Sequence, residues 1–124
     1  MTGFEHLLNS FDVGDELDAI ASSDPPAYLR RCFAEAVSSP ELSFARVQQI
    51  TVCVMVLDSI LNDRDYESME PELLADWRAH YGRPCALLKD TAVAALRRAQ
   101  EHVRKQDADA AAELEELEHR LAPA

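Results

Sequence analysis

Glycine is scarce in this chain, which has only Gly3, Gly14 and Gly82 among its 124 residues. The phosphate-binding loops of nucleotide-binding proteins need several closely spaced glycines, so that backbone N–H groups can approach the phosphates. β-Sandwiches and β-barrels need many tight turns, in which glycine supplies positive φ angles. The scarcity therefore excludes the common nucleotide-binding loops and favours helices over sheets.

Long apolar runs are also missing. The longest uninterrupted run covers residues 52–57, whereas a helix needs about 20 apolar residues to cross a bilayer. Residues 1–10 lack the basic and apolar regions of a secretory signal. We therefore expect a soluble protein that resides in the cytoplasm.

Cysteine is limited to Cys32, Cys53 and Cys85, an odd number without a closely spaced pair. Each falls on an apolar helical stripe, so we expect reduced thiols in the core and a reducing compartment. Buried thiols form thiolates poorly, which argues against cysteine catalysis. The basic residues are ten arginines against two lysines, a composition that, with abundant alanine, is typical of GC-rich bacterial genomes.

The apolar residues that are present recur at helical spacing. A first helix is predicted over residues 15–22 with Asp12 as its cap, and a second after Asp24, where two prolines occupy the first turn. The second helix has apolar positions at i, i+3, i+4, i+7 and i+8, which define one face of a helix: Leu29, Cys32, Phe33, Ala36 and Val37.

A third helix, over about 43–61, is predicted to form the centre of the fold, with a start signal at Ser39 and Pro40. Residues 50–57 are so rich in β-branched side chains that a buried strand is the alternative. A helical stripe continues through this run at Val47, Ile50, Val54, Leu57 and Leu61, and it favours a helix that is apolar on nearly all sides.

Pro71 opens a fourth predicted helix, with Gly82 after its end and Pro84 at the start of a fifth. Asp107 either begins a sixth helix or lies within a continuation of the fifth helix. The last apolar edge, Leu114, Leu117 and Leu121, packs either on its own bundle or on a second copy, which would make a homo-oligomer. The prediction is an all-α, compact bundle of five or six helices in a single domain, 1–124.

No catalytic, cofactor-binding or metal site is expected from the motifs. The histidines are scattered and form neither a His-x-x-x-His pair nor part of a zinc motif: His6, His80, His102 and His119. Glu116 and His119 have the Glu-x-x-His spacing of di-iron bundles, but no second such pair exists.

The acidic residues around 63–67 imitate the opening of a calcium loop. However, Ser68 and Leu74 stand where that loop needs a glycine and a glutamate. Asp58 is different from the other carboxylates because it directly follows the apolar centre of the third helix. It lies either at the polar edge of that helix or partly buried.

Charge is unevenly distributed. Residues 1–76 contain 15 acidic and 4 basic side chains, whereas residues 77–106 contain 2 and 7. An acidic field repels nucleic acids and anionic lipid and attracts basic proteins, so we expect no nucleic-acid or membrane partner. The candidate partner-binding residues are Asp63, Asp65, Tyr66, Glu67, Glu70, Glu72 and Asp76. The alternative is that the acidic residues only keep the protein soluble and that the loop containing them is solvated and binds no partner.

In size, acidity and lack of catalytic motifs, the chain resembles immunity proteins of bacterial toxin systems. It is also similar to an uncharacterised bacterial family that opens with Trp-Gly-x-Gly-x-Phe-x-Asn-Asp and has an Asp seven residues after the Phe. Phe11 and Asp18 have that separation, although the chain lacks the Trp-Gly-x-Gly and has Gly14 in place of the acidic residue.

The immunity-protein resemblance implies an acidic protein-binding module that neutralises a basic toxin or enzyme. An oligomeric structural or regulatory module and an enzyme with an unrecognised site are the alternatives.

Overall fold

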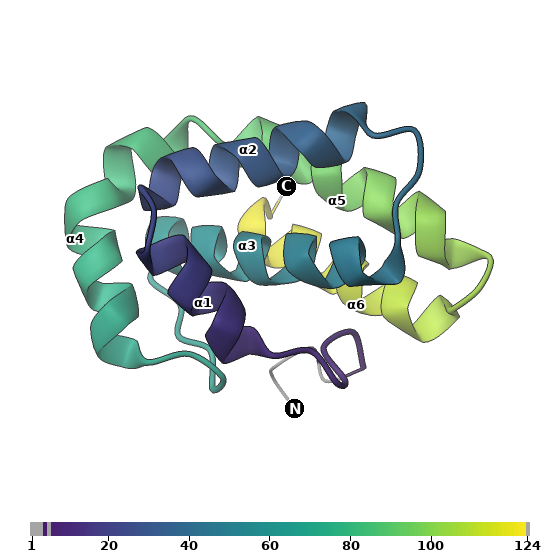
Figure 1. Cartoon of the computed structure of the whole chain (residues 1–124), viewed down its shortest axis with the longest axis horizontal. Coiled ribbons are helices and arrows are strands. Elements are labelled where there is room, and N and C mark those ends of the chain that lie inside the picture. The colour runs from purple at the N-terminus through teal and green to yellow at the C-terminus, as the bar shows by residue number, and fades with distance from the viewer. Residues whose placement is uncertain (1–3, 5, 124) are drawn as a thin grey trace.

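The computed structural model describes Phe4 and residues 6–123. Within that part of the chain no residue forms a strand, and the helices pack as one bundle with one hydrophobic core (Figure 1). The helices are α1 (Val13–Ala21), α2 (Pro25–Ser38), α3 (Phe44–Asn62), α4 (Pro71–Ala86), α5 (Lys89–Arg104) and α6 (Ala108–Leu121). The predicted all-α bundle is confirmed.

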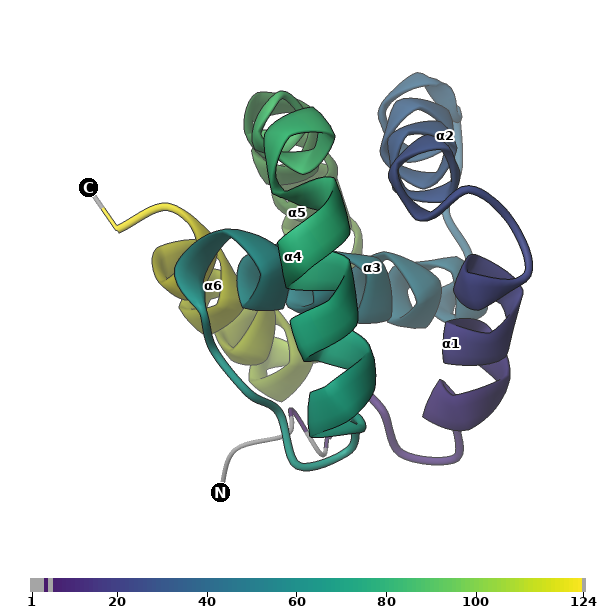
Figure 2. The ribbon, with the colours of Figure 1, turned by 90° about the vertical axis from the view of Figure 1, so that its left-hand side faces the viewer.

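Helix α3 is the centre of the bundle, and every side chain from 50 to 60 is buried. It contacts α1, α2, α4, α5 and α6, which surround it in Figure 2. The strand alternative for 50–57 is therefore wrong. A helix satisfies its backbone hydrogen bonds internally, so it can be buried on all sides without a partner strand.

By length and composition, α3 is also apolar enough to span a membrane, the one such helix in the described residues. However, 72% of its apolar window is buried inside the bundle. The core position accounts for this composition, as it does in the central helices of other helical proteins.

Two helix starts follow from local capping. The Asp12 side chain accepts a hydrogen bond of 2.9 Å from the backbone N–H of Asp15, as predicted for α1. Helix α3 begins later than the Ser39 and Pro40 signal suggested. The Ser43 hydroxyl accepts from the N–H of Arg46 at 3.1 Å and caps the helix there.

The boundary between the fourth and fifth helices was predicted wrongly. Helix α4 continues through Gly82 and Pro84 to Ala86, and Gly82 does not adopt the positive φ of a helix-ending residue. The extra turn buries Cys85, and Leu88, two residues after the end of α4, is also buried. Burial of these side chains offsets the hydrogen bond that a proline inside a helix removes.

Helix α6 packs on its own chain. Asp107 starts it by accepting from the N–H of Ala110 at 3.1 Å. Leu114, Leu117 and Leu121 are each 0% exposed, because α6 lies against α5 and α3. In this structure these leucines therefore pack within the chain. Val37, which was expected on the inner face of α2, is instead 44% exposed.

Candidate functional site

The seven predicted partner-binding residues lie in the connection between α3 and α4 and in the first half of α4. All the acidic members are exposed, namely Asp63, Asp65, Glu67, Glu70, Glu72 and Asp76. Tyr66 is the exception, because only 3% of it is exposed. Contrary to what an interface anchor requires, Tyr66 is not exposed in this structure: its ring packs near Phe4, with centroids 6.2 Å apart.

Tyr66 is held inside by Asp58. The Tyr66 hydroxyl donates to Oδ2 of Asp58 at 2.5 Å, and Arg64 Nε and Asn62 Nδ2 donate to the same carboxylate at 2.7 and 2.6 Å. Asp58 is 0% exposed, so of the two alternatives for this residue the structure has it fully buried. A buried carboxylate needs several donors to offset its lost hydration, and the connection supplies them.

The same contacts fix the connection to the end of α6. Asn62 Nδ2 donates to the carbonyl oxygens of Arg120 and Leu121 at 3.1 and 3.3 Å, and Arg64 Nη2 donates to that of Arg120 at 3.3 Å. Burial, followed by the hydrogen bond to Asp58, raises the pKa of Tyr66. Tyr66 is therefore a neutral donor at physiological pH. The connection is therefore held against α3 and α6 by hydrogen bonds.

Arg78 of α4 partly neutralises the exposed side of the connection. Its Nη1 lies 2.9 Å from Asp63 and its Nη2 lies 3.6 Å from Asp65, while Nε donates to the Ser59 carbonyl at 3.0 Å. Asp76 pairs with His80 at 3.2 Å.

The remaining carboxylates, Glu67, Glu70 and Glu72, make no ion pair with any described residue. We call these three residues the acidic edge. Helix α1 begins on the same lower side of the molecule as the connection and the start of α4 (Figures 1 and 2). The start of α1 adds two further exposed carboxylates, those of the cap residue Asp12 and of Asp15 in the first turn.

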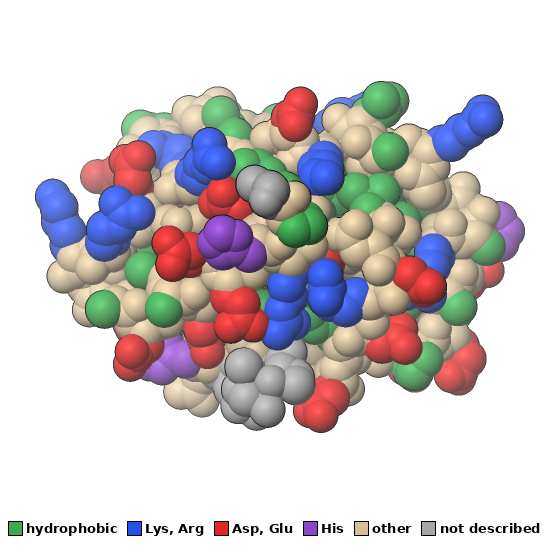
Figure 3. Space-filling view, turned by 180° about the vertical axis from the view of Figure 1, so that it is seen from behind, with side chains coloured by type: hydrophobic (Ala, Val, Ile, Leu, Met, Phe, Trp, Pro, Cys, Tyr) green, Lys and Arg blue, Asp and Glu red, His purple; other side chains and the backbone are tan. Residues whose placement is uncertain are grey.

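Figure 3 shows Lys and Arg side chains interspersed with Asp and Glu over the face seen from behind. Among the ion pairs, Arg97 of α5 lies 3.1 Å from Glu118 of α6, and Arg120 lies 2.5 Å from Glu116 within α6. Because Glu116 is paired with Arg120, the Glu116–His119 spacing does not bring a free carboxylate to His119.

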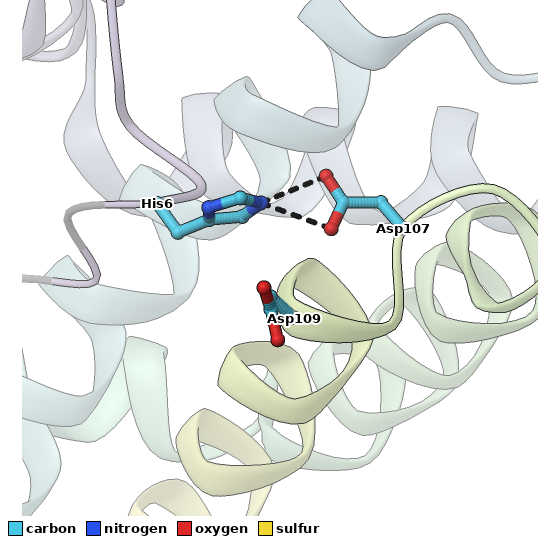
Figure 4. A group of neighbouring side chains, drawn as sticks. All are labelled: His6, Asp107 and Asp109. Carbon is cyan, nitrogen blue, oxygen red and sulfur yellow. Dashed lines mark hydrogen bonds and ion pairs between the residues drawn. The ribbon is translucent and has the colours of Figure 1, made fainter.

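A separate polar group lies where the N-terminal segment meets α6 (Figure 4). His6 Nε2 is 2.9 and 2.8 Å from the two carboxylate oxygens of Asp107, and Asp109 lies beside them. The hydrogen bond with Asp107 raises the pKa of His6 and lowers that of Asp107, which the Ala110 N–H lowers further. Glu113 accepts from the N–H groups of Leu7 at 2.8 Å and His6 at 3.3 Å. We call His6, Asp107 and Asp109 the His6 cluster.

The cysteines are buried and free, as expected. A hydrogen bond with the Cys32 thiol, together with burial, raises the pKa of Cys53. Burial raises the pKa of Cys85 to about 11. These effects disfavour the thiolate forms of Cys53 and Cys85. The carboxylate nearest to Cys53, that of Glu16, accepts from Tyr28 at 2.7 Å and Gln49 at 3.3 Å and so ties α1 to α2 and α3.

No family model, curated protein or solved structure matches this chain. The site must therefore be interpreted from its own residues. Phe11 and Asp18, which carried the similarity to a bacterial family, lie respectively against the core and on the exposed side of α1.

Sequence reasoning missed the His6 cluster. Its members are separated by about a hundred residues, and only Asp107 and Asp109 are close in the chain. Metal-ligand motifs are found from short spacings along one element, and no such spacing includes His6. The only local signal was the capping position of Asp107.

Proposed function

We propose that this chain is an acidic protein-binding module that binds a basic protein, and that its function is to neutralise a basic toxin or enzyme in the manner of an immunity protein. The observation that carries the proposal is the acidic edge, because its three carboxylates are exposed and unpaired among the described residues. Unpaired charges retain their full attraction for a cationic surface.

The support beneath the edge adds to this. Asp58, Tyr66, Arg64 and Asn62 fix the connection against α3 and α6. A segment that is already ordered loses little conformational entropy when a partner binds, and this favours affinity. Tyr66 contributes here by positioning the connection rather than by contacting the partner.

The charge on this side also favours rapid association. Opposite charges accelerate the encounter of two proteins, and salt screens the effect over about 8 Å at physiological ionic strength. A cationic active site, as in many enzymes that act on nucleic acids, is the kind of surface that an acidic cover would block.

The test compares two triple variants that change the net charge equally. Glu67→Gln, Glu70→Gln and Glu72→Gln remove the acidic edge, whereas Glu41→Gln, Glu101→Gln and Glu115→Gln remove exposed carboxylates elsewhere. Immobilised wild-type protein and both variants are incubated with the same bacterial extract, and retained proteins are identified by mass spectrometry. A basic partner should be retained by the wild type and the control triple and lost from the edge triple.

The purified partner then allows two sharper measurements. Its association rate with the wild type should fall steeply as salt rises, and the wild type should inhibit its activity. Retention that is identical for all three proteins would show that the edge is not the binding surface. Binding without any inhibition would exclude the neutralising role and leave only a binding module.

A further inference from the structure

We propose that the His6 cluster binds a divalent transition-metal ion, with His6, Asp107 and Asp109 as its ligands. One imidazole nitrogen and one carboxylate oxygen from each aspartate all lie within 4.8 Å of one another. Atoms bonded to one Zn²⁺ at about 2.1 Å lie roughly 3–3.5 Å apart. The His6 and Asp107 ligand atoms, 2.8–2.9 Å apart, are slightly closer than this, so an ion would move them a little apart and the Asp109 carboxylate would turn toward it to complete the set (Figure 4).

Charge favours a cation at this position. Asp107, Asp109 and Glu113 surround a single imidazole, and no arginine or lysine of the described residues forms an ion pair with any of them. Mixed imidazole and carboxylate ligands suit Zn²⁺ and Mn²⁺, whereas Mg²⁺ and Ca²⁺ prefer oxygen alone. The donor set therefore points to a transition metal.

Two of the ligands are held in place before any metal arrives. Glu113 accepts from the N–H groups of His6 and Leu7, and the Leu7 side chain is 0% exposed. Asp107 is fixed as the cap of α6 through the Ala110 N–H. The Asp109 side chain makes no hydrogen bond with the described residues and is free to turn toward the ion.

A metal ion here would join two parts of the chain. Three protein ligands leave coordination positions for water, which is typical of an open site. The ion would hold the segment that contains His6 against the start of α6, in addition to the existing hydrogen bonds. This inference does not depend on the proposed partner binding, because the ligands are not in the acidic edge.

The test is calorimetric titration of the untagged full chain with Zn²⁺ and, separately, with Mn²⁺, Mg²⁺ and Ca²⁺. One Zn²⁺ should bind per chain, more tightly than Mg²⁺ or Ca²⁺. Asp109→Asn should weaken Zn²⁺ binding by about tenfold or more, because it removes one charged oxygen ligand. This variant leaves the His6–Asp107 hydrogen bond and the cap intact, so folding should be preserved.

His119→Gln is the matched control, since His119 is an exposed histidine on the same helix. It should leave the affinity unchanged, whereas His6→Gln should weaken it as much as Asp109→Asn. Line broadening by Mn²⁺ in NMR spectra should centre on residues 6, 107 and 109. Zn²⁺ binding that is insensitive to His6→Gln and Asp109→Asn, or the absence of any binding at about 1 mM metal, would overturn the proposal.

Discussion

Two non-helical segments are each held to a helix by a carboxylate, Asp58 of α3 in one case and Asp107 at the start of α6 in the other, and the two carboxylates differ in burial. The connection after α3 is held by Asp58, which is 0% exposed and accepts from Tyr66, Arg64 and Asn62. The N-terminal segment is held by His6 and Asp107, whose side chains are 45% and 34% exposed. Water competes for every hydrogen bond of the second pair but for few of the first. The same chemistry should therefore stabilise the fold strongly in one place and weakly in the other.

The two segments also differ in how far their polar side chains are already paired within the chain. The buried network is satisfied within the chain, and it fixes the connection that contains Glu67 and Glu70. In the exposed His6 cluster, the Asp109 side chain has no hydrogen-bond partner among the described residues, and water reaches all three side chains. A buried carboxylate whose oxygens already accept hydrogen bonds from the chain has little capacity to bind a ligand. An exposed carboxylate contributes little to the stability of the fold.

The largest effect is expected when a carboxylate is buried without donors. Val54 is 0% exposed and lies one helical turn before Asp58 on α3. Val54→Asp should abolish folding, because an unpaired buried carboxylate costs several kcal/mol against a typical stability of ~5–15 kcal/mol. Circular dichroism and NMR spectra measure the loss. Val37→Asp, on the exposed side of α2, is the control and should remain folded; a folded Val54→Asp protein would show that donors are not what makes Asp58 tolerable.

The next effect comes from removing Asp58 itself. Asp58→Ala should lower the free energy of unfolding by about 2–4 kcal/mol, because the buried Tyr66 hydroxyl loses its acceptor, whereas Asn62 keeps the carbonyls of α6 and Arg64 can turn toward solvent. Tyr66→Phe should cost about 1–2 kcal/mol, since two donors to Asp58 remain. Urea denaturation measures both. Equal and negligible losses would mean that the network does not hold the connection.

Alkaline pH should weaken the fold through its buried acids. The pKa of Cys85 is raised from 9.0 to about 11 by burial. That of Tyr28 is raised from 10.0 to about 12, by burial and by its hydrogen bond to Glu16. A raised pKa contributes stability that is complete below the unfolded value and is lost as pH rises through the folded value.

The free energy of unfolding should therefore begin to fall near pH 9 and continue to fall toward pH 12, the interval between the unfolded and folded pKa values. Urea denaturation at a series of pH values measures it. Cys85→Ala should remove the first part of the fall and Tyr28→Phe the later part. A stability that stays constant across this interval would contradict the role of these two groups.

The smallest effect is expected at the exposed pair. His6→Gln in metal-free buffer with a chelator should leave the melting temperature nearly unchanged, because Leu7 and Phe4 remain buried and Glu113 still accepts from the Leu7 N–H. Differential scanning calorimetry measures this. A loss as large as that of Asp58→Ala would break the contrast between the two segments.

Periodicity along the chain was enough to predict the helical class and most of the core. The stripe at Val47, Ile50, Val54 and Leu57 identified the central helix, since a 3.6-residue repeat encodes which face of a helix is buried. Asp12 was predicted correctly as the cap of α1, because a capping side chain bonds to a backbone N–H only three residues away. Such patterns depend on residues close together in the sequence and not on which helices pack against them.

The tertiary structure decided the rest. Gly82 and Pro84 are typical of a helix end, yet burial of Cys85 and Leu88 in the core carries α4 past them. The acidic loop around Tyr66 suggested that its side chain is exposed. Tyr66 is buried because Asp58 and Phe4 lie close to it in the folded chain. His6 meets Asp107 across about a hundred residues. These outcomes depend on which helices pack together, and no spacing within one segment carries that information.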